Sequence, residues 1–405
     1  MNPFRSPYTG VLTAVAIAVA LALSVEQGLS ERVGHDFHVF WQAGRNFTTG
    51  DPLYHGYLPG ARVFKYPPFA ALVFQPLGLL PLQVAAVLFS LLNLALWVVA
   101  ILLTRDIVAH TSKRRDSIWL PVALAGVLTA QFFLDNFHHG QMNGVILVLI
   151  LLGIRAYLRE RDLAAAAYIV TATSIKVSPI FFAAWLVIRG RRRAAVAVLP
   201  LAAACILVPL LVRGPATGAA ELREYYESFL SGHQHAEVGS YTRGHNIASF
   251  VNRMMPDTAA SDGTAQLIYR VGWVAVALVF LAKLVQLRLR DAPPSSFELS
   301  MTFLVCLLLS PITFTANLVF LLFVFCAFLS VRVATIPIAG RLPAGVLLVA
   351  MAMTGLSGKD LVGRSVNLFV RDNGIFVLTM LMLFAASVAL AGRESPRGAA
   401  VTGAP

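Results

Sequence analysis

The feature that most constrains this chain is the recurrence of apolar runs along nearly its whole length. With 58% hydrophobic residues, 13% charged residues and a mean hydropathy of +0.73 over 405 residues, the chain has more apolar surface than one water-soluble core can bury. Several runs are shorter than the roughly 20 residues that a helix needs to cross a bilayer. The sequence therefore predicts an all-α polytopic membrane protein with about twelve transmembrane helices, at residues 11–29, 83–104, 117–134, 143–158, 162–175, 178–188, 194–212, 265–285, 297–312, 314–331, 342–357 and 374–391.

The basic residues predict how these helices are oriented. Clusters of Lys and Arg, such as Lys113–Arg115 and Arg191–Arg193, follow alternate runs. When they are placed in the cytoplasm together with Arg5, the inside segments hold 19 basic and 7 acidic residues, and the outside segments hold 13 of each. The whole net charge of +12 then falls inside, as the positive-inside rule expects. This explanation is favoured over nucleic-acid binding.

The predicted organisation is a single transmembrane domain over residues 1–392, followed by a cytoplasmic tail at 393–405. The first run is interpreted as an uncleaved helix rather than a signal peptide, because its removal would break the alternation. Two long segments, 31–66 and 213–264, face outward. Polar loops longer than about 12–15 residues are usually functional, so a site on the outer face is expected.

Asp36 is the first candidate for catalysis. It follows the first apolar run, among aromatic and imidazole side chains, where a carboxylate can act as a general base. Solvation alone would also explain a carboxylate at this place. A metal site formed by His35, Asp36 and His38 is a further alternative, but it lacks additional ligands. The three cysteines lie within apolar runs and have no metal or redox spacing; they are Cys205, Cys306 and Cys326.

Lys176 is the second candidate. It lies at the outer join of two undersized apolar runs, within Ser174–Pro179. A lysine in that position is costly unless it snorkels to water or has an anionic partner. Phosphate is the natural partner, so the residue is predicted to bind phosphate.

A polar apex at Asp135–Asn143 adds amide side chains to the same outer face. Gln141 and Asn143 offer both donors and acceptors to sugar hydroxyls. The alternative is a solvated loop in which Asn143 caps the following helix. In the second long loop, His245 and Arg253 either bind the oxygens of an acidic group or are part of the solvent-exposed surface.

These motifs occur in the order seen in glycosyltransferase family 87, which the chain resembles from about residue 30 to 330. This GT-C class family includes mycobacterial polyprenyl-phosphate-mannose-dependent alpha-1,2-mannosyltransferases and related arabinofuranosyltransferases. The motifs are short, but their joint order is fairly specific. They are Asp36 after the first helix, Gly50–Tyr54, Tyr66–Pro68, Gly140–Asn143, Ile175–Pro179 and Leu309–Thr313.

The resemblance implies a GT-C type enzyme of the bacterial plasma membrane with its active site outside. It would transfer mannose or arabinofuranose from a polyprenyl-phosphate donor to a glycolipid or polysaccharide acceptor. The family's first-loop acid matches Asp36, its Lys-x-x-Pro lysine matches Lys176, and its Gly-Gln-x-Asn apex matches Gly140, Gln141 and Asn143.

Two departures from the family pattern leave the identity of the transferred sugar undetermined. The family often has an aromatic residue and a His pair after the Ser-Pro corner, where this chain has Phe314–Asn317. Its usual Asn-Gln-Ser in the second long loop is represented here by His245–Ile247.

The expected chemistry needs a base on the acceptor hydroxyl and positive charge at the departing phosphate. Asp36 is the predicted base, which implies inversion, and Lys176, Arg253 and His245 are the predicted phosphate-binding residues. No nucleotide loop is visible, and the resemblance gives no reason to require a metal or cofactor. The predicted substrate-binding residues are His38, Asp51, Tyr54, Tyr66, Gln141, Asn143, Asn246 and Asn317.

Two other classes of function remain as alternatives. A secondary transporter would have a similar number of helices, but it should carry its polar groups near the midplane and often shows repeat symmetry. Here the polar motifs gather at outer apices, and no repeat is evident. A non-catalytic lipid-binding protein is the third class, because the family's His pair is missing.

Overall fold

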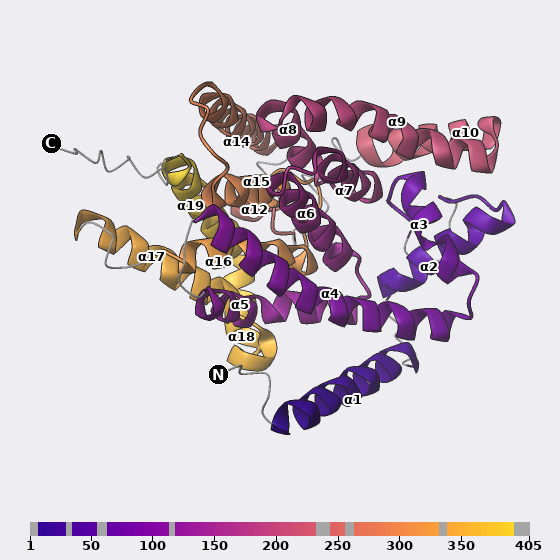
Figure 1. Ribbon diagram of the computed structural model, residues 1–405, viewed down its shortest axis with the longest axis horizontal. Helices are drawn as coiled ribbons and strands as arrows, with labels where there is room; N and C mark the ends of the chain where they lie inside the picture. The colour runs from indigo at the N-terminus through magenta and orange to yellow at the C-terminus, as the bar shows by residue number, and fades with distance from the viewer. Residues whose placement is uncertain are drawn as a thin grey trace, which may run out of the picture.

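The computed structural model describes residues 7–29, 35–54, 63–112, 118–231, 244–255, 263–331 and 338–392. The predicted cytoplasmic tail at 393–405 lies outside these ranges. All regular elements within them are helices (Figure 1). They are α1 (Pro7–Leu29), α2 (His35–Thr49), α3 (Pro68–Gly78), α4 (Leu82–Thr111), α5 (Trp119–His138), α6 (Asn143–Leu158), α7 (Asp162–Ile175), α8 (Ile180–Arg189), α9 (Arg192–Arg213), α10 (Pro215–Tyr225), the π-helix η2 (Tyr226–Ser231), α12 (Ile247–Met254), α14 (Thr264–Leu289), α15 (Ser296–Leu308), the 3₁₀-helix η3 (Thr315–Phe320), α16 (Leu321–Leu329), α17 (Ile338–Gly355), α18 (Lys359–Asp372) and α19 (Ile375–Leu390).

Length and composition identify the candidate membrane spans. Among the described residues, α4, α5, α9 and α14 are long and apolar enough to cross a membrane, and the bent pair α17–α18 adds a fifth if it is one span. The shorter apolar helices have 10–17 residues, less than the ~20 that crossing requires. The all-α membrane class is therefore supported, but the predicted number of about twelve transmembrane helices is not confirmed.

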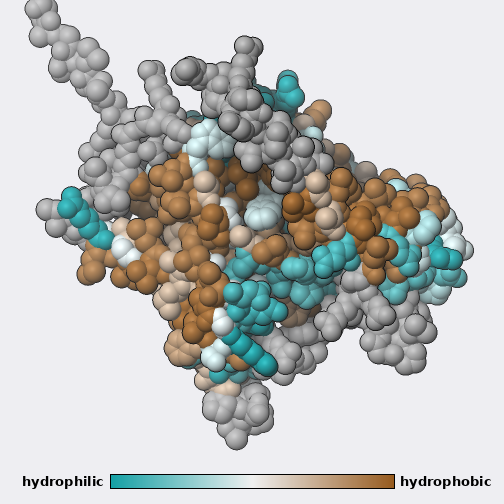
Figure 2. Space-filling model, turned by 90° about the horizontal axis from the view of Figure 1, so that it is seen from below, coloured by the Kyte–Doolittle hydropathy of each residue, from teal (hydrophilic) through white to brown (hydrophobic). Residues whose placement is uncertain are grey.

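The centre of the molecule is formed by α15 and α16. Every residue of α15 is buried, and so is α16 from Leu321 to Ala327. A helix that is apolar around its whole circumference must be covered on all sides. By contrast, α9 and α14 expose apolar residues such as Leu199 and Val271, and Figure 2 shows broad apolar areas on one face of the molecule. Apolar surface of this extent indicates contact with lipid.

The described parts of the two long segments predicted to face outward, 31–66 and 213–264, contain helices. The first contains α2, and the described parts of the second contain α10, η2 and α12. The side chain of Asn246 caps α12 by accepting a hydrogen bond from the Ser249 amide at 2.8 Å. Short helices such as these are stable because tertiary packing covers their apolar faces.

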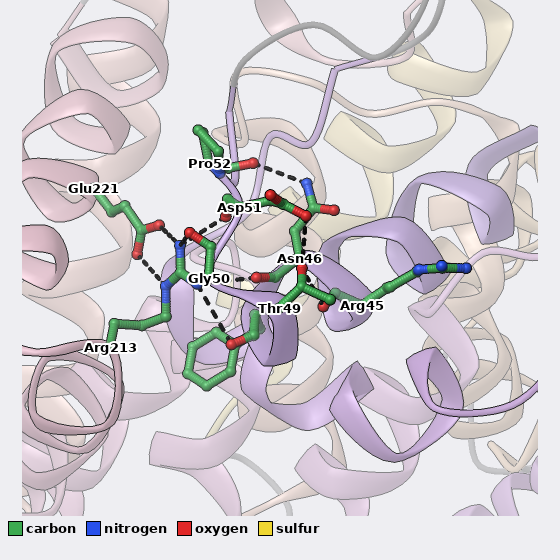
Figure 3. A network of polar contacts seen from close by, with 9 residues as sticks. Arg45, Asn46, Thr49, Gly50, Asp51, Pro52, Arg213 and Glu221 are labelled. Atoms are coloured by element: carbon green, nitrogen blue, oxygen red, sulfur yellow. Dashed lines mark hydrogen bonds and ion pairs between the residues drawn. The ribbon is translucent and has the colours of Figure 1, made fainter.

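A buried arginine from α9 holds the end of α2. Arg213 forms an ion pair with Glu221 at 2.5 Å, and both side chains are almost fully buried. The same guanidinium donates to the backbone carbonyls of Asn46 at 2.9 Å and of Asp51 at 2.7 Å (Figure 3). The Asn46 carbonyl also accepts a hydrogen bond from the Gly50 amide at 3.0 Å, so Arg213 adds a second partner there and fixes the end of α2 against α9.

A second buried ion pair joins α8 to the central helix α15. Arg189 and Glu298 contact each other at 2.8 Å, with 3% and 0% of their side chains exposed. The Glu298 carboxylate also accepts a hydrogen bond from the Trp185 indole at 2.7 Å. Each oxygen of the carboxylate is thus partnered, which is the condition for burying a charge.

Replacing Glu298 by Ala would leave the Arg189 charge buried without its partner. We expect a loss of about 3–5 kcal/mol of stability, seen as a lower midpoint of thermal unfolding in detergent. Glu227→Ala is the matched control, because Glu227 pairs with Arg223 on the surface and exposed pairs contribute little. Equal shifts for the two variants would contradict this assignment.

Candidate active site

Asp36 lies in the first turn of α2, against the turn that joins α5 to α6. Its backbone amide donates to the carbonyl of His139 at 3.3 Å, which docks the start of α2 on that turn. The side chain is partly buried. A carboxylate in the first turn of a helix interacts favourably with the helix dipole.

The turn Gly140–Asn143 connects Asp36 to Lys176. Gln141 Nε2 donates to Asp36 Oδ2 at 2.5 Å, and Lys176 Nζ donates to Asn143 Oδ1 at 2.7 Å. Both are charge-assisted hydrogen bonds, which are stronger than those between neutral groups. One four-residue turn therefore fixes the carboxylate at the start of α2 relative to the ammonium group that follows α7.

Gly140 allows this turn to approach α2 closely. Its φ is +61°, a conformation that favours glycine. A Cβ at this position would lie 2.6 Å from the Cβ of Phe37, beside Asp36 in α2. The glycine of this motif is thus required both by its backbone conformation and by the contact with α2.

Asn143 does not act as a helix cap. It is the first residue of α6, the N-cap is Met142, and no side chain makes a capping bond there. The side chain of Asn143 is fully buried and accepts the hydrogen bond from Lys176 instead. A buried ammonium group is costly without an acceptor, which explains why this amide turns toward Lys176. The capping interpretation of Asn143 is therefore wrong.

A cavity of about 1520 Å³ lies beside the turn. Of the residues predicted from the sequence, five line it: Asp36, Tyr66, Gln141, Lys176 and Asn317. The volume exceeds the roughly 300–1,000 Å³ of a typical ligand pocket. The cavity can therefore hold more than one small substrate.

One wall of the cavity is a stripe along α14 whose character changes along the helix. The lining residues of its first half are Gln266, Tyr269, Arg270 and Trp273, which are polar or aromatic. A spacing of three or four residues places side chains on one face of a helix. Further along, and on α8, the lining is apolar and consists of Val274, Ala277, Phe280, Leu281, Ile180, Phe181 and Ala184. A ligand with a polar and an apolar part matches such a wall.

Two more predicted residues support the cavity from behind. The hydroxyl of Tyr54 donates to the backbone carbonyl of Tyr66 at 2.8 Å. The amide of Asn246 donates to the carbonyls of Ser310 and Pro311 at 2.7 and 2.6 Å. Tyr54 and Asn246 are thus placed to hold lining residues rather than to line the cavity themselves.

His38 and Asp51 lie away from the cavity lining. His38 is exposed and stacks on Trp41, with ring centroids 5.9 Å apart. The carboxylate of Asp51 accepts a hydrogen bond from Thr49 at 2.7 Å, beyond the end of α2. Neither of these two predicted binding residues lines the cavity with Asp36.

His245 and Arg253 also lie outside the lining. Arg253 donates to the carbonyl of Gly244 at 2.6 Å, and His245 Nε2 lies 3.3 Å from Thr315 Oγ1. Burial, with the positive charges of Arg253 and Arg371, lowers the pKa of His245 to about 3. The ring is therefore neutral at neutral pH and carries no positive charge for a phosphate.

The cavity contains charged residues that the sequence did not single out as site residues. They are Lys65, Asp135, Arg270 and Arg371. A signal for Arg270 was present, because polar and aromatic residues recur at helical spacing in the first half of α14. No comparable signal exists for Arg371, whose position depends on how α18 packs.

The alternative metal site finds no support in the described residues. Within them, no group of three His, Cys, Asp or Glu side chains could hold a metal ion. The side chain of His35, which belonged to that alternative, lies outside the described part of the chain.

Apolar outer surfaces, together with a cavity that joins a carboxylate and a lysine to an apolar wall, define a membrane protein with a site for an amphiphilic ligand. The model of glycosyltransferase family 87 matches residues 64–311, which is more than half of the chain. The chain belongs to this family. The matched region contains the Gly140–Asn143 turn and Lys176, whereas Asp36 and α17 to α19 lie outside it.

The chain is similar to three mycobacterial mannosyltransferases. A polyprenol-phosphate-mannose-dependent alpha-(1-2)-phosphatidylinositol mannoside mannosyltransferase of Mycobacterium tuberculosis is 26% identical over 254 residues, covering 60% of this chain and 56% of the relative. A phosphatidylinositol pentamannoside mannosyltransferase of the same species is 26% identical over 297 residues, covering 71% and 64%. A phosphatidylinositol mannoside mannosyltransferase of Mycolicibacterium smegmatis is 33% identical over 132 residues, covering 29% and 30%. The chain thus spans less than two thirds of each relative, and no solved structure matches it.

The environment of Lys176 predicts a pH dependence of anion binding. Burial lowers the pKa of Lys176 to about 8, and the negative charge of Asp36 opposes this shift. The ammonium group is charged below that pH and neutral above it. We therefore expect affinity for a lipid-linked phosphodiester, whose own charge is constant in this range, to fall as the pH rises through about 8 in an equilibrium binding assay.

Two variants sharpen this measurement. Lys176→Arg keeps its charge to high pH, so the fall near pH 8 should disappear. Asp36→Asn removes the charge that raises the pKa of Lys176, so the fall should move to lower pH. Affinity that is flat from pH 7 to pH 9 in the wild type would remove Lys176 from the anion site.

Proposed function

We propose that this protein is an inverting membrane glycosyltransferase that uses a polyprenyl-phosphate sugar as donor and a glycolipid as acceptor, on the outer face of the bacterial plasma membrane. The observation that supports it best is the Gly140–Asn143 turn, which hydrogen-bonds the Asp36 carboxylate through Gln141 and the Lys176 ammonium through Asn143. A base and a cation on one cavity wall are what displacement of a phosphate from an anomeric carbon requires.

In the proposed reaction, Asp36 accepts the proton of an acceptor hydroxyl. The acceptor oxygen forms a bond to the anomeric carbon while the bond between that carbon and the phosphate oxygen breaks. The phosphate leaves with the electron pair as the lipid monophosphate, and the Lys176 ammonium stabilises its growing negative charge. Gln141 keeps the carboxylate oriented through the 2.5 Å hydrogen bond.

The apolar part of the cavity supports a lipid-linked donor. The residues of α8 and of the second half of α14 that line it are apolar, and α14 exposes most of its other surface. An isoprenoid chain can lie along this wall while the phosphate reaches Lys176. The cavity of about 1520 Å³ leaves space for the acceptor sugar beside the donor.

The choice of sugar and acceptor rests on the relatives. Their names specify polyprenol-phosphate-mannose and phosphatidylinositol mannosides, so mannose and an inositol-phosphate glycolipid are the first substrates to test. Arabinofuranose remains the second sugar. Ala316 and Asn317 line the cavity at the corner where the family often has histidine, which makes this corner a candidate determinant of the sugar.

Asp36→Asn should lower kcat by about 10²- to 10⁴-fold, because it removes the general base but keeps the size of the side chain. The measurement is transfer from radiolabelled polyprenyl-phosphate mannose to phosphatidylinositol mannoside by purified protein in lipid. Donor affinity should change little at a pH well below the pKa of Lys176, where the lysine is charged with or without Asp36.

Asp106→Asn is the control for this comparison. Asp106 carries the same charge but pairs with Arg155 outside the cavity, so its replacement should leave transfer near the wild-type rate. Equal product from wild type and Asp36→Asn would reject Asp36 as the base. A wild type that forms no product with either sugar would instead favour a lipid-binding or transport role.

A further inference from the structure

Four of the charged residues that line the cavity are connected by a series of contacts. Lys176, Asp36, Asp135 and Arg371 all line it. Lys176 and Asp36 bond to the same turn, through Asn143 and Gln141. The backbone amide of Asp36 donates to the carbonyl of His139, whose ring nitrogen lies 3.4 Å from the Asp135 carboxylate, and the charge of Arg371 acts on Asp135. These contacts run from Lys176 through Asp36 to Asp135, with Arg371 beyond it; Lys65 and Arg270 are the other cations of the lining.

Arg371 is suited to bind a ligand. It is half-buried near the end of α18, and within the described part of the chain its side chain makes no hydrogen bond or ion pair. A guanidinium presents five donors in a planar fork that matches a phosphate. The Asp135 carboxylate beside it is an acceptor for sugar hydroxyls.

The helix that carries Arg371 has the features of an interfacial helix. It is bent by 110° from α17 (Figure 1) and exposes Leu361, Val366 and Phe369. After the break at Gly363, a helical spacing places Val366 and Phe369 on the side opposite Arg371. Such helices lie in the plane of the membrane surface with their cations at the level of lipid headgroups.

The geometry of a single displacement decides which substrate Arg371 meets. The acceptor hydroxyl attacks the anomeric carbon from the face opposite the departing phosphate. In the proposed function, Lys176 binds the donor phosphate and Asp36 accepts the proton of the acceptor hydroxyl. The acceptor sugar therefore approaches from the side of Asp135 and Arg371. The phosphate of an inositol-phosphate glycolipid would then stand beyond the sugar that reacts, toward α18.

We propose that Arg371 binds the phosphate of an anionic glycolipid acceptor, and that α18 brings this headgroup to the cavity from the membrane surface. This inference rests on the proposed function, because it assumes a lipid-phosphate donor at Lys176. It assigns the two cations to two different phosphates, Lys176 to the donor and Arg371 to the acceptor.

The test compares Arg371→Gln with Arg364→Gln, which removes the same charge from the same helix at a position that does not line the cavity. Each is assayed at saturating donor with phosphatidylinositol mannoside and with an uncharged alkyl mannoside. Arg371→Gln should raise KM for the anionic acceptor by about 10- to 100-fold and leave KM for the neutral acceptor and for the donor unchanged. Arg371→Lys should recover part of the loss, and Arg364→Gln should match the wild type.

Three outcomes would overturn the proposal. A KM raised equally for both acceptors would show that Arg371 binds sugar hydroxyls or shapes the cavity. A raised KM for the donor would place Arg371 at the donor phosphate. Unchanged KM for all substrates would remove it from the site.

A binding measurement separates this inference from the proposed function. In the Asp36→Asn background, where catalysis is blocked, the affinity for phosphatidylinositol mannoside in nanodiscs is compared with and without Arg371→Gln. Loss of affinity supports the role of Arg371 even if the wild type transfers no sugar, and equal affinity rejects that role. Wild-type turnover alone tests the proposed function.

Discussion

An ammonium group and a carboxylate inside a membrane protein need partners, and the Gly140–Asn143 turn provides them. A charge removed from water costs free energy unless hydrogen bonds replace its hydration. The turn gives an amide donor to Asp36 and an amide acceptor to Lys176. Its position depends on the close contact of Gly140 with α2, and the far end of α2 is held by Arg213. The site is thus built on the docking of one short helix against one turn.

The large cavity and the positions of its charged residues suggest where the donor and the acceptor bind in the proposed reaction. Asp36 is linked to Lys176 through the Gly140–Asn143 turn, and to Asp135 through His139. The wall formed by α14 runs from polar to apolar, so it suits an amphiphile that lies along the helix. In the proposed reaction, two lipid-linked molecules meet at one carboxylate in this cavity.

Much of the candidate site could be predicted from short motifs, because polar residues at membrane apices are costly without a role. Asp36, Gln141 and Lys176 stood out for this reason, and all three line the cavity. The roles of their neighbours could not be predicted, since they depend on tertiary packing. The sequence left capping of α6 by Asn143 open as an alternative to sugar binding, whereas in the structure the Asn143 side chain accepts a hydrogen bond from the buried Lys176.

The fold shows the same limit. Apolar runs correctly predicted an all-α membrane protein, but a run of 10–17 residues does not reveal whether its helix spans the membrane, and about twelve spans remain unconfirmed. The two long segments at 31–66 and 213–264 looked like loops because they are polar, yet their described parts contain helices such as α2 and α12, each of which buries an apolar face. Arg371 reaches the cavity only because α18 bends back from α17.

The most direct test of the central claim is a structure of the protein with a polyprenyl phosphonate analogue of the donor, whose carbon–phosphorus bond prevents transfer. The account predicts the phosphonate against Lys176 Nζ, the anomeric carbon facing the Asp36 carboxylate and the isoprenoid chain along the apolar half of α14. A phosphonate bound beside Arg253 and His245, away from Lys176, would contradict it.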